Sequence, residues 1–350
     1  MDRLFVDLDR FADRLALVDE HGSSHSYAEF LAQADALVAA LGPERRLIAL
    51  EADNQIESVA AYVGALRAGH AVLLAGRDGA SPEGRIAQLF RPHAVHRPDG
   101  AGGWVLERRH EEPVALHPAL AVLLSTSGST GSPKLIRLSH DNLRSNATAI
   151  AEYLAFADGE RAITSLPPYY SYGMSVINSH LVTGNAIILN DASVSEEAFW
   201  ARVERHGATS FAGVPHSYDL LERTGFLGRT HPGLRYYTQA GGRLPPEKVT
   251  LFADDAAAQG RRFYVMYGQT EAAPRMAWLP PERASRHPDC IGLPVPGGEF
   301  RLDVSDGAPD GQGELIYRGP NVMMGYAADP AELALGQGTD ELRSGDIAER

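Results

Sequence analysis

The chain has 350 residues, of which 44% are hydrophobic, and a formal charge of −13 at pH 7. That length predicts about two or three structural units with a sizeable core. The acidic balance disfavours a broad basic surface for nucleic acid or for anionic lipid. Cys290 is the single cysteine, so an intrachain disulfide is excluded and a reducing, cytoplasmic setting is expected. No apolar stretch reaches the ~18 residues of a membrane span, so no membrane partner is expected.

The first elements read as alternating helices and strands. Ser26 and Glu29 have capping-box spacing at the start of an amphipathic helix, SYAEFLAQADALVAAL. The runs RLIALEA and AVLLA flank a helical pattern from Ile56 to Ala68 that Gly69 ends. These three segments predict a strand–helix–strand unit.

Residues 79–113 are rich in Arg, His, Pro and Gly, and they predict an irregular surface connection. Within this stretch, the spacing of His93, His96 and His110 matches no compact metal site. We therefore expect solvated loop histidines rather than ligands.

The α/β rhythm continues to about residue 280. A glycine-rich loop follows AVLLST and leads to the helix DNLRSNATAIAEYL, for which residues 140–142 are expected to provide the cap. Ser193 and Glu196 form a second possible capping box, and Pro245 and Pro246 suit the first turn of a later helix. Further apolar runs predict a predominantly parallel α/β fold: RAITSLP, NAIILN, ATSFAGV, LRYYTQA and RFYVMYG. Short extended runs after residue 280, split by Gly and Pro, predict a small antiparallel β unit over 281–350.

The loop after AVLL, Ser125 to Lys134, has the composition of a polyphosphate site. Glycines let the backbone approach phosphate oxygens, hydroxyls donate hydrogen bonds, and Lys134 supplies a mobile positive charge. A flexible Ser/Gly linker is the alternative, although a linker has no need to follow a buried strand and end in lysine. The P-loop of ordinary NTPases does not match, because Leu135 follows the lysine. The candidate binding residues in this loop are Ser127, Gly128, Ser129, Thr130, Gly131 and Lys134.

Six segments in order carry a family resemblance: STSGSTGSPK, LPPYYSYG, QAGGRLP, YGQTEA, GELIYRGPNVMMGY and RSGD. Together they resemble the adenylate-forming superfamily of acyl- and aryl-CoA synthetases, firefly-type luciferases and peptide-synthetase adenylation domains. The resemblance covers essentially the whole chain. It implies a large N-terminal domain, residues 1–350. Residues 1–280 would form two mainly parallel sheets sandwiched by helices, and 281–350 a distorted β-barrel.

The resemblance also assigns roles. Tyr267 would stack on adenine beside Gly268, Thr270 would contact the adenylate phosphate, and Glu271 would hold Mg²⁺, a cation that prefers oxygen ligands. Asp346 would accept hydrogen bonds from both ribose hydroxyls, with a frayed chain end as the alternative. The adenine would lie against Ala240, Gly241 and Gly242, where small residues leave room for a flat ring.

The implied reaction is attack of a carboxylate on the ATP α-phosphorus, which yields acyl-AMP and pyrophosphate. Thr130, Lys134, Thr270 and Glu271 would position and neutralise the phosphoryl groups. The acyl group would then pass to a thiol, either CoA or a carrier protein. In the family a small C-terminal domain supplies a catalytic lysine, and the sequence ends before that domain. We therefore expect this chain to bind the adenylate more readily than it forms it.

Two departures from the family bear on the acid. Tyr170 stands where acyl- and aryl-CoA synthetases often have a histidine, and Ser171 stands where peptide synthetases have an aspartate for the substrate amino group. A buried ammonium without a negative partner is costly, so a fatty, aromatic or hydroxy acid is favoured. An amino-acid adenylation domain and a non-catalytic nucleotide-binding relative stay open as alternatives, and Cys290 is expected to be incidental. The expected pocket residues are Tyr170, Tyr172, Gly213, Val214, Ser217, Ala240 and Met276.

Overall fold

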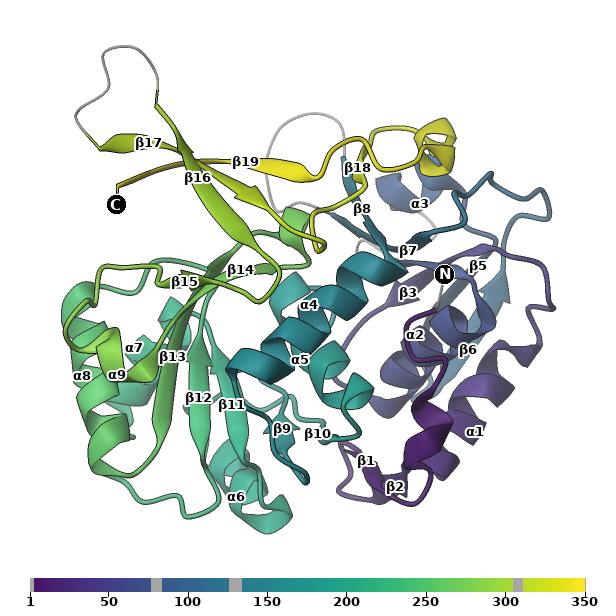
Figure 1. The fold of residues 1–350 in the computed structure, drawn as a ribbon. Coiled ribbons are helices and arrows are strands. Elements are labelled where there is room, and N and C mark those ends of the chain that lie inside the picture. The colour runs from purple at the N-terminus through teal and green to yellow at the C-terminus, as the bar shows by residue number, and fades with distance from the viewer. Residues whose placement is uncertain (1–2, 77–83, 126–133, 305–310, 350) are drawn as a thin grey trace.

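The computed structural model describes residues 3–76, 84–125, 134–304 and 311–349, which form three sheets with helices packed around them (Figure 1). Central strands of both large sheets run parallel, and antiparallel strands are added at their edges. The predicted α/β fold with a separate small β sheet is thus confirmed.

The seven-stranded sheet contains the first strand–helix–strand unit. Its order is β18 (Gly325–Ala327), β8 (Leu135–Ser139), β7 (Leu120–Ser125), β4 (Ala71–Ala75), β3 (Leu47–Glu51), β5 (Ala94–Pro98) and β6 (Trp104–Arg108). Helices α1 (Tyr27–Ala39), α2 (Ile56–Ala68) and α3 (Arg85–Phe90) accompany it. Ser26 and Glu29 form both bonds of the predicted capping box, and α2 ends at Gly69, which adopts a φ of 92°. Local signals therefore placed these helix ends correctly.

The nine-stranded sheet has the order β15 (Leu293–Pro294), β14 (Arg275–Leu279), β13 (Arg262–Gly268), β12 (Tyr236–Gln239), β11 (Ser210–Gly213), β9 (Arg161–Ile163), β10 (Ala186–Ile188), β1 (Leu15–Val18) and β2 (Ser24–Ser26). Helices α4 (His140–Tyr153) and α5 (Ser171–Val182) lie between the two large sheets (Figure 1). Helices α6 (Glu197–His206), α7 (Pro215–Arg223), α8 (Pro246–Ala258) and α9 (Pro281–Ala284) supply apolar residues to the core on the other face. Short 3-10 helices are η1 (Leu8–Phe11), η2 (Thr270–Ala272) and η3 (Pro330–Ala334).

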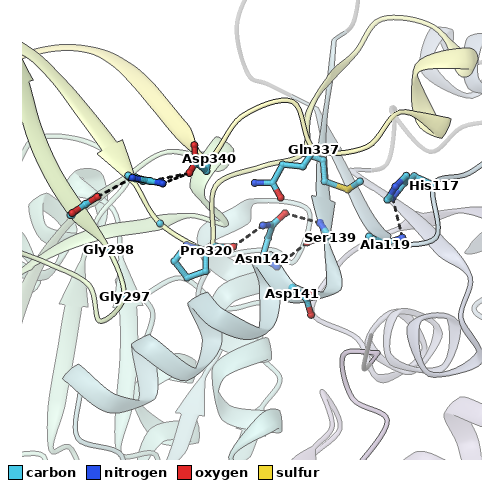
Figure 2. Close-up of a pocket in the computed structure, with 14 residues that line it drawn as sticks. His117, Ala119, Ser139, Asp141, Asn142, Gly297, Gly298, Pro320, Gln337 and Asp340 are labelled. Atoms are coloured by element: carbon cyan, nitrogen blue, oxygen red, sulfur yellow. Dashed lines mark hydrogen bonds and ion pairs between the residues drawn. The ribbon is translucent and has the colours of Figure 1, made fainter.

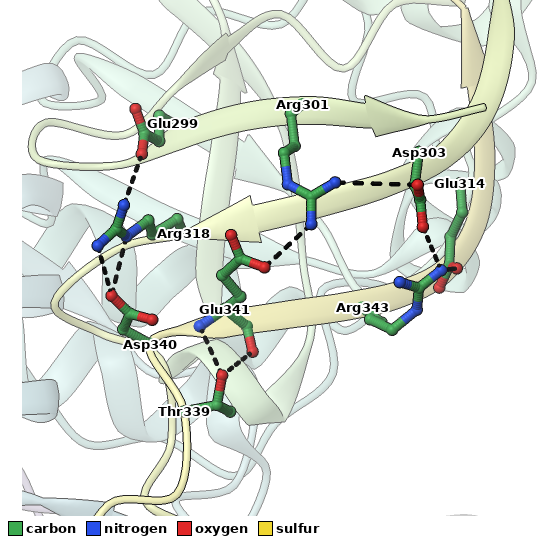
Figure 3. A network of polar contacts seen from close by, with 9 residues as sticks. All are labelled: Glu299, Arg301, Asp303, Glu314, Arg318, Thr339, Asp340, Glu341 and Arg343. Atoms are coloured by element: carbon green, nitrogen blue, oxygen red, sulfur yellow. Dashed lines mark hydrogen bonds and ion pairs between the residues drawn. The ribbon is translucent and has the colours of Figure 1, made fainter.

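The third sheet is antiparallel and consists of β16 (Glu299–Asp303), β17 (Gln312–Arg318) and β19 (Glu341–Glu349). Ion pairs connect its strands on an exposed surface (Figure 3), including Arg301 with Glu341 at 3.0 Å and Arg343 with Asp303 at 2.7 Å. Exposed pairs of this kind contribute little individually, roughly 0–1 kcal/mol each. They do tie β19 to its neighbours beside the chain end.

Four expectations from the sequence were wrong. Residues 79–113 contain α3, β5 and β6 rather than an irregular connection. His96 is buried in β5 with its ring stacked on Trp104 at 4.9 Å, and the His93 ring contacts the His110 carbonyl oxygen at 2.6 Å, so neither is a solvated loop histidine. The glycine-rich loop joins β7 to β8, which precedes the predicted helix. Before α6, the Ser193 amide donates to the Glu196 carboxylate at 2.7 Å, but Glu196 itself is the N-cap and makes no side-chain capping bond.

Candidate active site

A cavity of about 1190 Å³ opens between the nine-stranded and three-stranded sheets. It lies beyond the carboxyl ends of the parallel strands β12 and β13, where ligands commonly bind in open α/β sheets. Segments far apart in the sequence meet there: the start of α5, the turn after β12, the turn from β13 through η2, and the strands β17 and β19.

Ten of the predicted site residues line this cavity. They are Tyr170, Tyr172, Ala240, Gly241, Gly242, Tyr267, Gly268, Thr270, Glu271 and Asp346. Predicted residues that lie outside its lining are Gly213, Val214, Ser217, Met276 and Lys134. Lys134 is exposed directly before β8, and Met276 is fully buried. Ser127, Gly128, Ser129, Thr130 and Gly131 lie outside the described residues.

Val214 and Ser217 form a layer behind the cavity. The Ser217 hydroxyl accepts a hydrogen bond from the Val214 amide at 3.3 Å, at the start of α7. Gly241 has a φ of 79°, and a Cβ on it would lie 2.3 Å from the Tyr170 hydroxyl and 3.2 Å from Val214. Glycine is therefore required here, because any larger residue would push the Tyr170 side chain away.

A hydrogen bond between Tyr267 and Asp346 connects the nine-stranded sheet to the three-stranded sheet. The Tyr267 hydroxyl donates to the Asp346 carboxylate at 2.5 Å, and the Gln269 side-chain amide donates to the Ser344 carbonyl at 2.7 Å. Burial, followed by the hydrogen bond to Asp346, raises the pKa of Tyr267, so the phenol remains a donor at neutral pH. Asp346 lies within β19, which pairs with β17 on both sides of it, and this geometry contradicts the frayed end considered from the sequence.

The turn after β13 is held in place by a close backbone contact. A Cβ on Gly268 would lie 1.9 Å from the Pro274 carbonyl oxygen, so only glycine allows the chain to fold back in this way. On the turn, the Thr270 hydroxyl lies 2.9 Å from the Ser171 hydroxyl at the start of α5. This places a pair of neutral hydroxyl groups on the cavity wall.

Glu271 faces the cavity with a restrained side chain. Its carboxylate accepts a hydrogen bond from the Tyr326 hydroxyl at 2.8 Å, and burial together with this carboxylate raises the pKa of Tyr326 to about 12. Among residues 3–76, 84–125, 134–304 and 311–349, no cluster of three or more His, Cys, Asp or Glu side chains suits a metal ion. A single carboxylate fits Mg²⁺ that takes its other ligands from phosphates and water.

Gln269 and Arg275 also line the cavity, although neither is among the site residues predicted from the sequence. Gln269 lies inside the motif YGQTEA, so its position was available as a signal. Arg275 starts β14 and is only 2% exposed. Its proximity to α4 and α5 depends on the fold and has no counterpart in local sequence.

A second cavity of about 590 Å³ lies where α4 begins, facing the three-stranded sheet (Figure 2). Ser139 and Asn142 form a capping box there, with N–O distances of 2.9 and 3.0 Å, and the Asn142 amide donates to the Pro320 carbonyl at 2.8 Å. The capping role predicted for residues 140–142 is thus confirmed at Asn142. None of the predicted site residues lines this cavity, so the candidate chemistry belongs to the larger one.

Comparison with known proteins places the fold and the motifs in one family. Residues 85–327 match the family model described as AMP-binding enzyme. The sulfoacetate–CoA ligase of Cupriavidus necator is 32% identical over 76% of this chain and 53% of its own length. The L-proline–[L-prolyl-carrier protein] ligase of Pseudomonas fluorescens is 26% identical over 95% and 74%. The crystal structure of VinN has a TM-score of 0.81 at 23% identity and covers 99% of this chain and 96% of its own.

The chain spans about half the length of several curated relatives that it matches, the sulfoacetate–CoA ligase among them. In the described part of the chain no helix is long and apolar enough to cross a bilayer. The family match covers more than half of the 350 residues, and the fold agrees with it along the whole chain. The chain therefore belongs to the AMP-binding enzymes of the adenylate-forming superfamily and contains their N-terminal domain.

Proposed function

We propose that this protein activates a carboxylic acid with ATP, forming acyl-AMP and releasing pyrophosphate. The observation that carries the proposal is the meeting of ten predicted site residues from four distant motifs on one cavity wall. The tyrosine ring suits stacking on adenine, and the glycine-rich turns leave room for that flat base. The carboxylate suits the ribose hydroxyls, and the threonine hydroxyl suits a phosphate oxygen.

In this proposal Asp346 accepts hydrogen bonds from the ribose, and Tyr267 lies against the adenine with its hydroxyl directed to Asp346. Thr270 donates to the α-phosphate, and Glu271 holds Mg²⁺. The metal would supply Lewis-acid charge neutralisation of the phosphates. Lys134 and the loop residues Ser127, Gly128, Ser129, Thr130 and Gly131 are proposed to contact the β- and γ-phosphates.

The proposed acyl pocket includes Tyr170 and Tyr172 on the cavity wall, with Gly213, Val214, Ser217 and Met276 behind it. Tyr172 is fixed in place, since its hydroxyl lies 2.7 Å from the Thr238 hydroxyl and donates to the Thr238 carbonyl at 2.9 Å. CoA is the first candidate for the thiol acceptor, because the sulfoacetate ligase transfers to CoA by name. A carrier protein is the second, by the name of the prolyl ligase. The cytoplasm is the proposed compartment, since Cys290 is the single cysteine.

Exchange of labelled pyrophosphate into ATP, dependent on added acid and Mg²⁺, tests the activation step. Trapping of the acyl group by hydroxylamine identifies the acid. Thr270→Val and Glu271→Gln should each lower the exchange rate by roughly 10²-fold, whereas Glu299→Gln, outside the large cavity, should not. Equal rates in all three variants would contradict the proposed roles.

Activation of an amino acid is the second candidate, and the relative that acts on L-proline favours it. Ser171 argues against an amino-acid substrate, because its hydroxyl is hydrogen-bonded to Thr270 and provides no negative charge for an ammonium group. An exchange assay that responds to α-amino acids and to no other acid would establish this candidate. Calorimetry that detects no binding of ATP or of an acyl-sulfamoyl-adenosine would instead favour a non-catalytic relative.

A further inference from the structure

Arg275 is a buried cation on the wall of the large cavity. Its guanidinium donates to the Tyr153 hydroxyl at 3.1 Å, the Met266 sulfur at 2.6 Å and the Ser175 hydroxyl at 3.1 Å. It lies 4.4 Å from the centre of the Tyr172 ring. Every one of these partners is neutral.

Within the described part of the chain, Arg275 has no counter-ion. None of the ion pairs among residues 3–76, 84–125, 134–304 and 311–349 includes it, and its buried Nε has no hydrogen-bond partner. Removing a guanidinium from water without an anion is costly, and a cation–π contact offsets only part of that cost. A buried cation that borders a ligand cavity is therefore suited to an anionic ligand.

The surrounding cavity wall fits the same ligand. Ser171 and Tyr172 lie in the first turn of the twelve-residue helix α5, whose N-terminal end carries partial positive charge. Tyr170 and Tyr172 are neutral, and burial raises the pKa of each. Tyr170, Ser171 and Tyr172 thus add no negative charge that would oppose a second anionic group on the substrate.

We propose that Arg275 binds a second anionic group, a carboxylate or sulfonate, at the end of the substrate acid opposite the carboxylate that is activated. This proposal rests on the proposed function and narrows it from carboxylic acids in general to small acids with two negative charges. A planar guanidinium offers paired N–H donors that match both anions. A plain fatty or aryl acid would leave the buried charge without an anion.

The test uses two acyl-sulfamoyl-adenosines that differ at the acyl end. One carries a succinyl group with a terminal carboxylate, and the other carries a butanoyl group with a terminal methyl. Calorimetry on the wild-type chain should show the carboxylated ligand binding at least tenfold more tightly. In Arg275→Met the carboxylated ligand should weaken by roughly 10- to 100-fold, while the methyl-ended ligand binds equally well or better.

Two further variants separate recognition from structure. Arg275→Lys keeps a positive charge and should retain part of the preference for the carboxylated ligand. Ser175→Ala removes one neutral acceptor, keeps the cation and should leave the preference unchanged. A wild-type preference for the methyl-ended ligand, or equal weakening of both ligands in Arg275→Met, would overturn the proposal.

Titration with succinate or 3-sulfopropanoate alone makes the two proposals distinguishable. Anion binding that depends on Arg275, without binding of either adenosine ligand, would support the anion site and contradict the proposed adenylation function. Binding of both adenosine ligands with no dependence on Arg275 would support the adenylation function and contradict the anion site.

Discussion

Asp346→Asn tests the nucleotide half of the site most directly. The substitution keeps the shape of the side chain and removes the charge that accepts the Tyr267 hydroxyl at 2.5 Å and would accept the ribose hydroxyls. A hydrogen bond to a charged group contributes about 1.5–3 kcal/mol. Asp346 is exposed, and the asparagine retains one acceptor oxygen. We therefore expect a loss near the lower limit, about 1.5–2 kcal/mol, or roughly 10- to 30-fold in Kd.

Calorimetry with ATP and with 2′,3′-dideoxy-ATP distinguishes ribose recognition from a general effect. Asp346→Asn should weaken ATP by the stated factor and change the dideoxy nucleotide by less than about threefold. Asp340→Asn is a matched control, because Asp340 is also exposed beside β19 and pairs with Arg318 at 2.7 Å outside the large cavity. Equal losses for both nucleotides, or an equal loss in the control, would refute the assignment of Asp346 to the ribose.

Three further predictions concern stability. Gly268→Ala should lower the free energy of unfolding by about 1–3 kcal/mol, since the new Cβ meets the Pro274 carbonyl; a urea titration measures this, with Gly338→Ala as control because its nearest neighbour lies 3.9 Å away. Ser139→Ala should cost about 1 kcal/mol in the same assay through loss of the α4 cap. Acid should destabilise the fold between pH 6.5 and about 4, because burial lowers the pKa of four histidines to about 4 and the unfolded chain binds the protons. Each of the four histidines should lower the free energy of unfolding by about 2 kcal/mol by pH 5. His180→Gln should therefore reduce the loss of stability between pH 7 and pH 5 by that amount. The four are His70, His96, His140 and His180.

What the sequence predicted correctly is mostly local. The Ser26 capping box, the end of α2 at Gly69 and the start of α8 at Pro246 depend on interactions within one or two helical turns. Expectations failed where partners from elsewhere in the chain decide the structure. Within 79–113, residues 94–98 form β5 because β3 offers a pairing edge, residues 104–108 then pair with β5 as β6, and His96 is buried there against Trp104.

The candidate site divides in the same way. Tyr267, Thr270 and Glu271 share one motif, so contiguity alone marks them, and motif order was enough to expect Asp346 beside them. The Tyr267–Asp346 hydrogen bond itself requires β19 to pair with β17, which no local pattern specifies. Four residues expected on the pocket wall lie outside its lining: Gly213, Val214, Ser217 and Met276. Which face of a strand a residue occupies, and what packs in front of it, is set by the fold and not by its motif.

The charges around the cavity give the remaining constraint on the ligand. Carboxylates of Glu271, Asp289, Asp346 and Glu349 line it together with Arg243 and Arg275, so the negative side chains outnumber the positive ones and a bare triphosphate gains from cations that accompany it. Arg275 contacts neutral groups on α4, α5 and β13, whereas Asp346 contacts Tyr267 near the end of β13 and Gln269 directly after the strand. In the proposals made above, Arg275 receives negative charge on the acid, while Mg²⁺ and Lys134 offset the charge on the nucleotide. The two proposals together place an acid with two negative charges and ATP with Mg²⁺ in one cavity.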